Sequence, residues 1–286
     1  MKLTSKTVIL FQRKLGFKGK DQDGKVGKMT AKALKAELTQ QQDKMTKKMF
    51  PLIMNGSRKR LATAYGQLLC LNCNIDPGPI AGLLGTQSTH AFEEMLFLDK
   101  YKRLPHAWRD HIHIPNPNNW PGDSQKDLIE FYGEPGKKGK DVPLKWVTLP
   151  YPHYLSWNLD VKINRMKCHE KVAESMEKVL KEVVDSYGEK AINELGLDIW
   201  GGCFNYRKKR GGNTLSTHSW GISVDYLPNR NQLRAGWKNA VFARPDYDAW
   251  WQAWEKEGWV GLGRTQNYDW MHIQACRTPR LVLENL

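Results

Sequence analysis

Apolar residues recur with helical spacing in several parts of the chain. Residues 8–15 and 61–71 each place apolar side chains on one face at a period near 3.6 residues, which predicts two helices in the N-terminal third. The same period runs from Lys162 to Tyr187 and predicts a long amphipathic helix. Residues 101–150 show no such period and are rich in Pro, Gly, His and Asn, so they are expected to form a linker and long loops.

Shorter apolar stretches after the long helix have the character of strands. Predicted strands cover residues 199–206, 222–227 and 270–274, and the second alternates between two faces. Residues 247–257 predict a helix between the last two strands, and its three tryptophans are typical of a core. Helices followed by strands favour an α+β domain over alternating βαβ units.

A weak internal repeat marks the N-terminal region. The pattern apolar-Gly-x-x-Thr-x-x-Ala-apolar in residues 26–34 returns in residues 84–92, with Ser for Thr. The glycine permits a tight turn, and the hydroxyl of Thr30 or Ser88 is expected to cap the helix that follows. Each copy follows one of the two predicted helices, so the region is expected to hold one or two small helical modules with a shared core.

The charge of the chain is concentrated at its N-terminal end. Of a net charge of +14, residues 1–60 contribute 16 Lys and Arg against 4 Asp and Glu. Such a segment attracts polyanions, and both nucleic acid and anionic polymers of a bacterial envelope fit the same field. A basic face that only confers solubility is the alternative.

Other features of composition set the expected compartment. With 286 residues and 40% hydrophobic content, the chain is long enough for two globular domains. The apolar stretch 8–11 is too short for a signal-peptide core, so the protein is not expected to export itself. Five scattered cysteines favour a reducing compartment over a disulfide framework. Cys70 and Cys73 lack a second ligand pair and are expected to be small buried hydrophobic residues rather than zinc ligands.

Two short segments contain the residue types of a hydrolytic zinc site, STHSWGISVDYL at 216–227 and YDWMHIQ at 268–274. His218 and Asp225 lie seven residues apart. Gly221 allows a sharp turn after His218, and strand alternation turns Asp225 away from the buried face. With His272 they supply three N and O ligands, which leaves a fourth tetrahedral position for water. Polar residues at strand ends are the alternative interpretation.

The remaining groups of such a site are also present. Asp269 precedes His272 by three residues, so one can bind the metal while the other acts as general base. Zinc lowers the pKa of a bound water to about 7, where a carboxylate can take its proton. A fixed cation must then stabilise the oxyanion, and Arg207 or Arg210 can fill this role.

The N-terminal sequence VILFQRKLGFKGKDQDGKVGKMTAKAL resembles the small three-helix peptidoglycan-binding module of bacterial and phage wall hydrolases. The matching positions are Phe11, Gln12, Gly16, Asp23, Gly24, Val26, Gly27 and Thr30. The second copy matches less well, with Pro77-Gly78 in place of Asp-Gly and an insertion before Leu84. The resemblance implies a helical wall-binding domain over residues 1–98, in which Phe11, Gln12, Asp23, Gly24 and Thr30 are the candidate wall-binding residues.

The C-terminal part, residues 125–286, resembles the M15 metallopeptidases, the family of D-alanyl-D-alanine carboxypeptidases and phage L-alanyl-D-glutamate endopeptidases. STHSWGISVDYL matches the signature S-x-H-x-x-G-x-apolar-x-D, and DWMH matches the second signature, D/E-x-x-H. The resemblance implies a hedgehog-like or DD-peptidase-like α+β domain with a small antiparallel sheet, after a linker at 99–124. It assigns one Zn²⁺ to His218, Asp225 and His272, the catalytic carboxylate to Asp269, the substrate-orienting cation to Arg207 and a supporting hydrogen bond to Ser216.

Together the two likenesses indicate a modular phage-type endolysin, an antimicrobial wall hydrolase that cuts peptidoglycan stem peptides, as a monomer. It is expected to be stored in the host cytoplasm until a holin-like pore protein releases it to the wall, and not to bind nucleic acid. The L-alanyl-D-glutamate endopeptidase is favoured over a D-alanyl-D-alanine carboxypeptidase, because a wall-binding appendage and no export signal suit lysis. A non-catalytic envelope-binding or virion structural protein is the alternative from another class.

Overall fold

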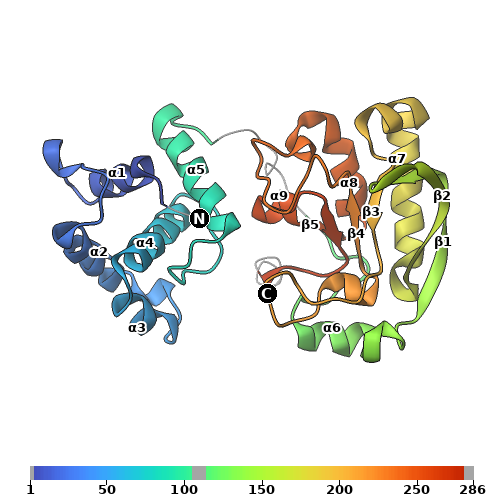
Figure 1. Cartoon of the computed structure of the whole chain (residues 1–286), viewed down its shortest axis with the longest axis horizontal. Helices are drawn as coiled ribbons and strands as arrows, with labels where there is room; N and C mark the ends of the chain where they lie inside the picture. The colour runs from blue at the N-terminus through green and yellow to red at the C-terminus, as the bar shows by residue number, and fades with distance from the viewer. Residues whose placement is uncertain (1–2, 105–113, 280–286) are drawn as a thin grey trace. The chain divides into compact units, whose positions relative to one another are not determined.

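The chain folds into two compact units. The computed structural model describes residues 3–104 and 114–279 (Figure 1). One unit comprises Met1–Ala107 with Gln266–Tyr268, and the other comprises Trp108–Thr265 with Asp269–Leu286. Each unit has its own hydrophobic core. No helix within the described ranges is both long and apolar enough to cross a bilayer.

The division between the units falls within residues 99–124, the predicted linker, of which residues 105–113 lie outside the described ranges. The ends of this segment are more ordered than a linker. Helix α5 continues to Tyr101, and the Trp120 side chain is 4% exposed in the core of the C-terminal unit. Trp120 also donates its indole N–H to the Glu257 carbonyl at 3.1 Å. Its large apolar surface favours burial over exposure in a connecting segment.

The N-terminal unit is helical. Its α-helices are α1 (Ser5–Lys14), α2 (Lys28–Gln40), α3 (Met49–Met54), α4 (Arg58–Asn72) and α5 (Thr86–Tyr101), with short 3-10 helices at Gly19–Asp21 and Gln42–Lys44. The predicted helices at 8–15 and 61–71 are confirmed as α1 and α4. Each starts at a hydroxyl cap, because Thr4 accepts the Thr7 N–H and Ser57 accepts the Arg60 N–H.

A buried glutamine on α1 organises the first copy of the repeat. The Gln12 side chain is 1% exposed, and its Oε1 accepts the Gly24 N–H at 3.0 Å. Its Nε2 donates to the Lys25 carbonyl at 3.0 Å and to the Asp23 carboxylate at 2.8 Å. The Thr30 hydroxyl lies 3.4 Å from the same nitrogen. The Gln12 side chain on α1 therefore connects the loop between α1 and α2 to both helices by hydrogen bonds.

Gln67 on α4 takes the same place in the second copy. Its Oε1 accepts the Gly82 N–H at 2.9 Å, and its Nε2 donates to the Leu83 carbonyl at 3.2 Å. The same Nε2 donates to the Ser88 hydroxyl at 2.9 Å. These three partners occupy the positions that correspond in the repeat to the glycine, carbonyl and hydroxyl partners of Gln12. The repeat therefore extends to a hydrogen-bond network, with a longer loop between glutamine and glycine in the second copy.

The predicted helix caps at Thr30 and Ser88 are wrong. Both residues lie inside their helices, and the N-cap positions are taken by Gly27 for α2 and Gly85 for α5. The hydroxyls face the buried glutamines instead, since an amide enclosed in this core must find partners for its donors and acceptor.

Several candidate wall-binding residues belong to the interior. Phe11 and Gln12 are each 1% exposed, and Thr30 is 5% exposed. The Phe11 ring packs edge-on against Tyr65 and Phe92 at centroid distances of 5.7 and 5.6 Å, so the two copies share one core. An external polymer cannot reach these three side chains, and their role is to hold the fold. Asp23 is exposed, while Gly24 lies against the backbone of Ser5.

Loss of the buried glutamine should loosen the second copy. Gln67→Met keeps the side-chain length but leaves the Gly82 N–H and the Leu83 carbonyl without their partner. We expect a loss of about 1–3 kcal/mol, seen as faster hydrogen exchange of the Gly82 amide. The exposed Gln40→Met is the control. Unchanged protection of Gly82 in Gln67→Met would contradict a structural role for the network.

The C-terminal unit is built on a six-stranded sheet of order β2-β1-β3-β4-β6-β5 (Figure 1). The strands are β1 (Leu144–Leu155), β2 (Asn158–His169), β3 (Ile199–Gly202), β4 (Ser223–Tyr226), β5 (Val260–Gly261) and β6 (His272–Gln274). The β1–β3 pair is parallel and the other pairs are antiparallel. The α+β class is therefore confirmed, while the predicted antiparallel sheet is in fact mixed.

Helices cover this sheet and complete the core. The α-helices are α6 (Gln125–Tyr132), α7 (Glu170–Leu195), α8 (Asp248–Lys256) and α9 (Leu262–Gln266). Short 3-10 helices lie at Lys137–Gly139, Thr217–Trp220, Val241–Ala243 and Pro245–Tyr247. Helix α8 confirms the prediction for residues 247–257. Its tryptophans are at most 1% exposed, so they are core residues as expected.

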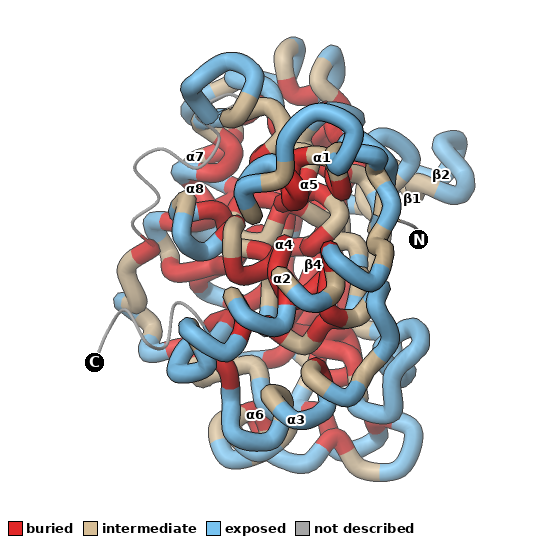
Figure 2. Tube along the Cα trace, turned by 90° about the vertical axis from the view of Figure 1, so that its left-hand side faces the viewer, coloured by how far each residue is buried: buried red, intermediate tan, exposed pale blue. Residues whose placement is uncertain are grey.

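The predicted helix over residues 162–187 is wrong in its first part. Residues up to His169 belong to β2, and the helix begins at Glu170. Met166 and Cys168 are buried at alternate positions, which is the period of a strand. The long β1–β2 hairpin supplies this pairing from residues that were predicted as loop. Figure 2 shows that the tube is mostly buried along β4. Trp157 in the turn before β2 and Asn158 at the start of β2 are exposed.

His153 on β1 is a buried histidine that contacts Tyr226 of β4. His153 Nε2 is 2.8 Å from the Tyr226 hydroxyl, and Nδ1 is 3.1 Å from the Tyr151 carbonyl. The ring is 0% exposed, and burial lowers its pKa from 6.5 to about 4. The neutral imidazole is therefore the form that the folded protein favours.

The stability of the metal-free protein should consequently fall in mild acid. Between pH 6.5 and 4 the unfolded chain protonates this histidine while the folded protein does not, which costs about 3 kcal/mol by pH 4. In His153→Gln, the fall in the free energy of unfolding over this range should be smaller by that amount. Urea unfolding at several pH values measures it, and equal slopes in the two proteins would contradict the assignment.

Candidate metal centre

Three short elements of the C-terminal unit carry the predicted ligands. His218 lies in the 3-10 helix Thr217–Trp220, Asp225 on β4 and His272 on β6. Gly221 ends the 3-10 helix with a φ of +67°, the left-handed conformation that the sequence predicted for a sharp turn. In the antiparallel β4–β6 pair, Asp225 stands directly opposite His272. Residues 47 positions apart in sequence thus face each other across one ladder.

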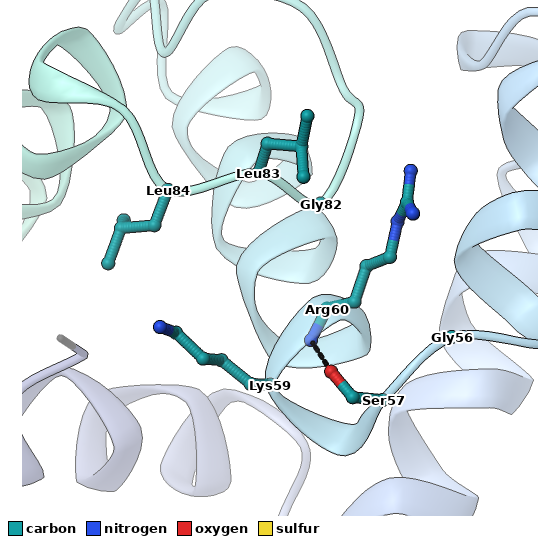
Figure 3. A pocket seen from close by; sticks show the side chains of 7 residues that line it. All are labelled: Gly56, Ser57, Lys59, Arg60, Gly82, Leu83 and Leu84. Atoms are coloured by element: carbon teal, nitrogen blue, oxygen red, sulfur yellow. Dashed lines mark hydrogen bonds between the residues drawn. The ribbon is translucent and has the colours of Figure 1, made fainter. Parts of the chain in front are cut away.

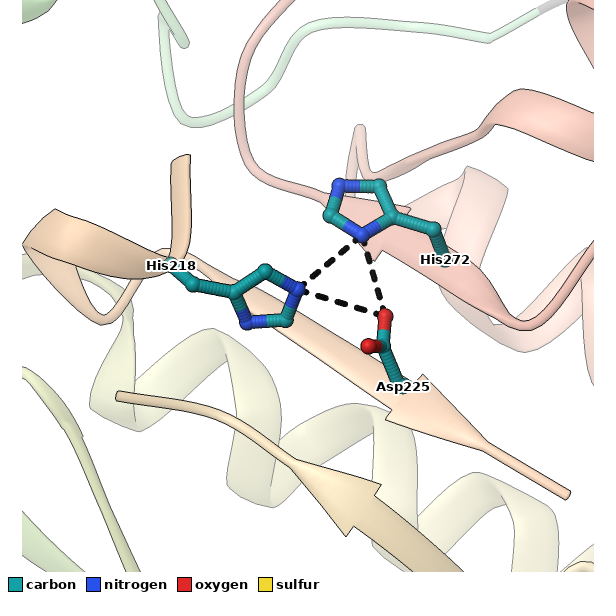
Figure 4. A group of neighbouring side chains, drawn as sticks. All are labelled: His218, Asp225 and His272. Carbon is teal, nitrogen blue, oxygen red and sulfur yellow. Dashed lines mark hydrogen bonds and ion pairs between the residues drawn. The ribbon is translucent and has the colours of Figure 1, made fainter. Parts of the chain in front are cut away.

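The three side chains converge on one point (Figure 4). His272 Nδ1 lies 3.0 Å from Asp225 Oδ1 and 3.2 Å from His218 Nε2. His218 Nε2 lies 3.3 Å from the same carboxylate oxygen. The two histidines are 3% and 6% exposed, so the cluster is shielded from solvent on most sides.

The spacing of these atoms fits a tetrahedral zinc ion. Ligand atoms about 2.0–2.1 Å from zinc lie about 3.3 Å from each other in a tetrahedron, close to the three separations between His218, Asp225 and His272. Two imidazole nitrogens and one carboxylate are also the donor types that zinc prefers. Because two ring nitrogens and an anionic oxygen face each other at such short range, the cluster attracts a positive charge, either a metal ion or a shared proton.

The electrostatic interactions within the cluster favour the ionised form of Asp225 and the protonated form of His272. Burial by itself would raise the pKa of Asp225, but the charges and hydrogen bonds of His218 and His272 outweigh it and hold that pKa well below its usual range. Burial likewise opposes a charge on His272, but the hydrogen bond and charge of Asp225 outweigh it and raise the pKa of this histidine. The carboxylate thus stays ionised and favours a cation beside the imidazoles.

Partners outside the cluster hold the two rings. His218 Nδ1 lies 2.6 Å from the Cys203 carbonyl. His272 Nε2 lies 3.3 Å from both the Thr217 hydroxyl and the Gln274 side-chain oxygen. Sequence patterns did not single out these three residues. For Gln274 a signal exists, because a polar residue two positions after a strand ligand lies on the same face of the sheet.

Asp269 stands beside the cluster with a buried oxygen. Its Oδ1 is buried and has no hydrogen-bond partner among the described residues. Burial raises the pKa of Asp269 to about 6, against the lowering effect of the charges on His272 and Arg207. The residue also has a φ of +53°, a left-handed conformation that is uncommon outside glycine. A carboxylate with a raised pKa and a free oxygen has the properties of a general base.

Arg207 is the cation whose charge acts on Asp269. Its backbone is well anchored, because its N–H donates to the Ser219 hydroxyl at 3.0 Å and its carbonyl accepts the Ser216 N–H at 2.9 Å. The side chain is exposed and free to meet a substrate. Arg210 lies in the exposed turn of the same loop. Of the two predicted candidates, Arg207 is therefore favoured, because its charge acts on Asp269.

Ser216 forms a hydrogen bond to the first candidate ligand, as expected. Its hydroxyl accepts the backbone N–H of His218 at 3.4 Å and so caps the 3-10 helix. It thus supports the first candidate ligand through the backbone and not through the imidazole ring.

A separate pocket of about 470 Å³ lies on the N-terminal unit, beside the first turn of α4 (Figure 3). It is lined by Gly56, Ser57, Lys59, Arg60, Gly82, Leu83 and Leu84. These seven residues include no acid, histidine or cysteine, so they offer neither a general base nor metal ligands. Cys70 is fully buried, as expected, whereas Cys73 is only partly buried.

Comparison of the chain with models of protein families, with curated proteins and with solved structures gives no match. The chemistry of the site is therefore inferred from its geometry. Among residues 3–104 and 114–279, the cluster of His218, Asp225 and His272 is the group of three acids, histidines or cysteines whose atoms can meet at one metal ion.

Proposed function

We propose that the protein is a zinc-dependent peptidase of M15 type that cleaves peptidoglycan stem peptides. The observation that carries the proposal is the convergence of His218 Nε2, Asp225 Oδ1 and His272 Nδ1 at separations of 3.0–3.3 Å. A shared proton alone could also hold these three groups together. It would not account for the free, buried oxygen of Asp269 beside them.

The side chains divide the chemistry between them. Bound zinc would supply a Lewis acid that polarises the scissile carbonyl and activates water. Asp269 would take a proton from the attacking water, for which a pKa raised to about 6 by burial is suitable near neutral pH. It would then return the proton to the departing amine. The Arg207 guanidinium would face the negative charge that develops on the carbonyl oxygen or orient a carboxylate of the stem peptide.

The N-terminal unit supports a role in holding the wall. Lys28, Lys32 and Lys35 lie one helical turn apart on α2, and all three are exposed. Within the described part of the chain, none of them forms an ion pair. We propose that this lysine row attracts anionic polymers of the envelope, so that the peptidase acts at a raised local concentration of substrate.

The proposed biological role is lysis of a bacterial host by a phage-type endolysin that reaches the wall through a pore made by another protein. We favour cleavage between L-alanine and D-glutamate because a wall-holding unit suits an enzyme that opens the polymer from within. This preference follows the likeness of the two motifs to phage enzymes.

Digestion of purified peptidoglycan with the zinc-loaded protein tests the proposal. We expect turbidity to fall, and mass spectrometry to reveal fragments with new glutamate amino ends. Release of D-alanine alone would identify a carboxypeptidase instead. Zinc binding without any cleavage would indicate a non-catalytic envelope protein, and retardation of nucleic acid in a gel at moderate salt would support the remaining alternative.

A further inference from the structure

The two candidate histidine ligands present different ring nitrogens to the cluster. His218 presents Nε2 and His272 presents Nδ1. A neutral imidazole carries its proton on one nitrogen and its lone pair on the other, and only the lone pair can bind a metal ion. The partner of the outer nitrogen therefore decides whether each ring is ready to bind.

For His218 the backbone makes this choice. Its Nδ1 lies 2.6 Å from the Cys203 carbonyl, and a carbonyl oxygen can only accept a hydrogen bond. The proton of His218 is therefore held on Nδ1, and the lone pair of Nε2 faces the cluster. No side-chain substitution at Cys203 removes this acceptor.

For His272 two acceptors compete for one proton. On the inner side, Asp225 Oδ1 lies 3.0 Å from Nδ1 and attracts the proton to the nitrogen that should bind the metal. On the outer side, Nε2 lies 3.3 Å from the Thr217 hydroxyl and 3.3 Å from the Gln274 oxygen. A hydroxyl can donate or accept, so Thr217 does not select either tautomer.

The orientation of the Gln274 amide makes this residue a hydrogen-bond acceptor on the outer side of the ring. Its Nε2 donates to the Cys276 carbonyl at 3.3 Å, and this turns Oε1 toward His272 as an acceptor. Gln274 is 3% exposed, so water does not replace this partner. It lies two residues after His272 on β6, and the strand itself therefore directs both side chains to the same face.

We propose that Gln274 is a positioning residue that holds the His272 proton on Nε2 and so presents the Nδ1 lone pair to the metal ion. The inference rests on the proposed zinc site. Without the Gln274 oxygen, Asp225 draws the proton to Nδ1, and the ion must displace that proton before it can bind.

Two measurements on three variants test this role. Gln274→Met removes the acceptor at nearly constant volume, Gln274→Glu keeps an acceptor oxygen, and Thr217→Val is the matched control at the other Nε2 partner. Zinc affinity is measured by competition with a chromophoric chelator. The tautomers are read from imidazole ¹⁵N shifts in the zinc-free protein, at a pH where both rings are neutral. The His218 resonances serve as an internal reference for intact folding, because their tautomer depends on the backbone.

We expect Gln274→Met to weaken zinc binding by about 10–100-fold, the usual effect of losing a partner of a histidine ligand, and to move the His272 proton toward Nδ1. Gln274→Glu should retain the wild-type tautomer. Thr217→Val should also retain this tautomer and should weaken zinc binding less than Gln274→Met does. An unchanged His272 tautomer in Gln274→Met, or a shift caused by Thr217→Val instead, would overturn the proposal. If the wild-type protein binds no zinc, the proposed function fails, while the ¹⁵N spectra still decide the role of Gln274.

Discussion

Asp269→Asn should lower kcat/KM for stem-peptide cleavage by about 10²–10⁴-fold, the usual contribution of a general base. The amide of asparagine cannot take a proton from the attacking water. Asparagine also tolerates the left-handed backbone conformation at this position, where φ is +53°, so the fold should be retained. Steady-state cleavage of a soluble stem peptide, monitored by mass spectrometry, measures the effect.

A measurement of zinc affinity distinguishes two causes of lost activity in Asp269→Asn, the loss of the general base and the loss of the metal ion. Asp269 is not one of the three converging side chains, so Asp269→Asn should bind zinc as the wild type does. The exposed Asp246→Asn is a matched control that should retain full activity. Activity within a few-fold of the wild type in Asp269→Asn would exclude this carboxylate as the base.

Asp225→Asn should abolish cleavage and weaken zinc binding by more than about 100-fold, since the loss of a ligand exceeds the 10–100-fold effect of losing its supporting partner. The variant removes the negative charge that pairs with both imidazoles. It also removes the interaction that raises the pKa of His272. Competition with a chelator measures the affinity, and ¹⁵N spectra follow the titration of His272.

The pH dependence of this variant distinguishes a metal site from a purely structural ion pair. In the zinc-free protein the pKa of His272 should be lower in Asp225→Asn than in the wild type, because burial then acts without the opposing carboxylate. An exposed substitution near the start of β2, Asp160→Asn, should alter neither zinc affinity nor this titration. If the wild-type protein shows the expected titration but no zinc binding, the cluster is an ion pair and not a metal site.

Local sequence was sufficient for those parts of the fold whose determinants lie within a few residues. The apolar periods of α1, α4 and α8 predicted helices at these positions, because a helix that packs on a core shows its buried face in the sequence. The glycine after His218 predicted the turn that the structure has at Gly221. The internal repeat predicted one or two small modules, and in the structure its two copies share the same glutamine-centred contacts.

Tertiary pairing overrode the local pattern elsewhere. Residues 162–169 have apolar positions that fit a helix, yet pairing with β1 makes them a strand. The first part of β1 was likewise predicted as loop from its composition. Local composition did not predict this strand, since a strand gains its hydrogen bonds from a partner that can be distant in sequence. The candidate wall-binding residues Phe11, Gln12 and Thr30 matched a sequence motif, but only the packing of two copies around one core reveals that they are buried.

For the candidate metal site, too, some features were predicted from local sequence and others depend on the tertiary structure. Sequence by itself predicted that His218, Asp225, His272 and Asp269 belong to one site, because each of the two signatures is a local pattern. Only the tertiary structure decided which atoms meet, since the β4–β6 ladder sets Asp225 opposite His272. It also decided the ring orientations, because the partner of an outer imidazole nitrogen can lie anywhere in the chain. For His218 that partner is a backbone carbonyl, which no residue-type pattern can reveal.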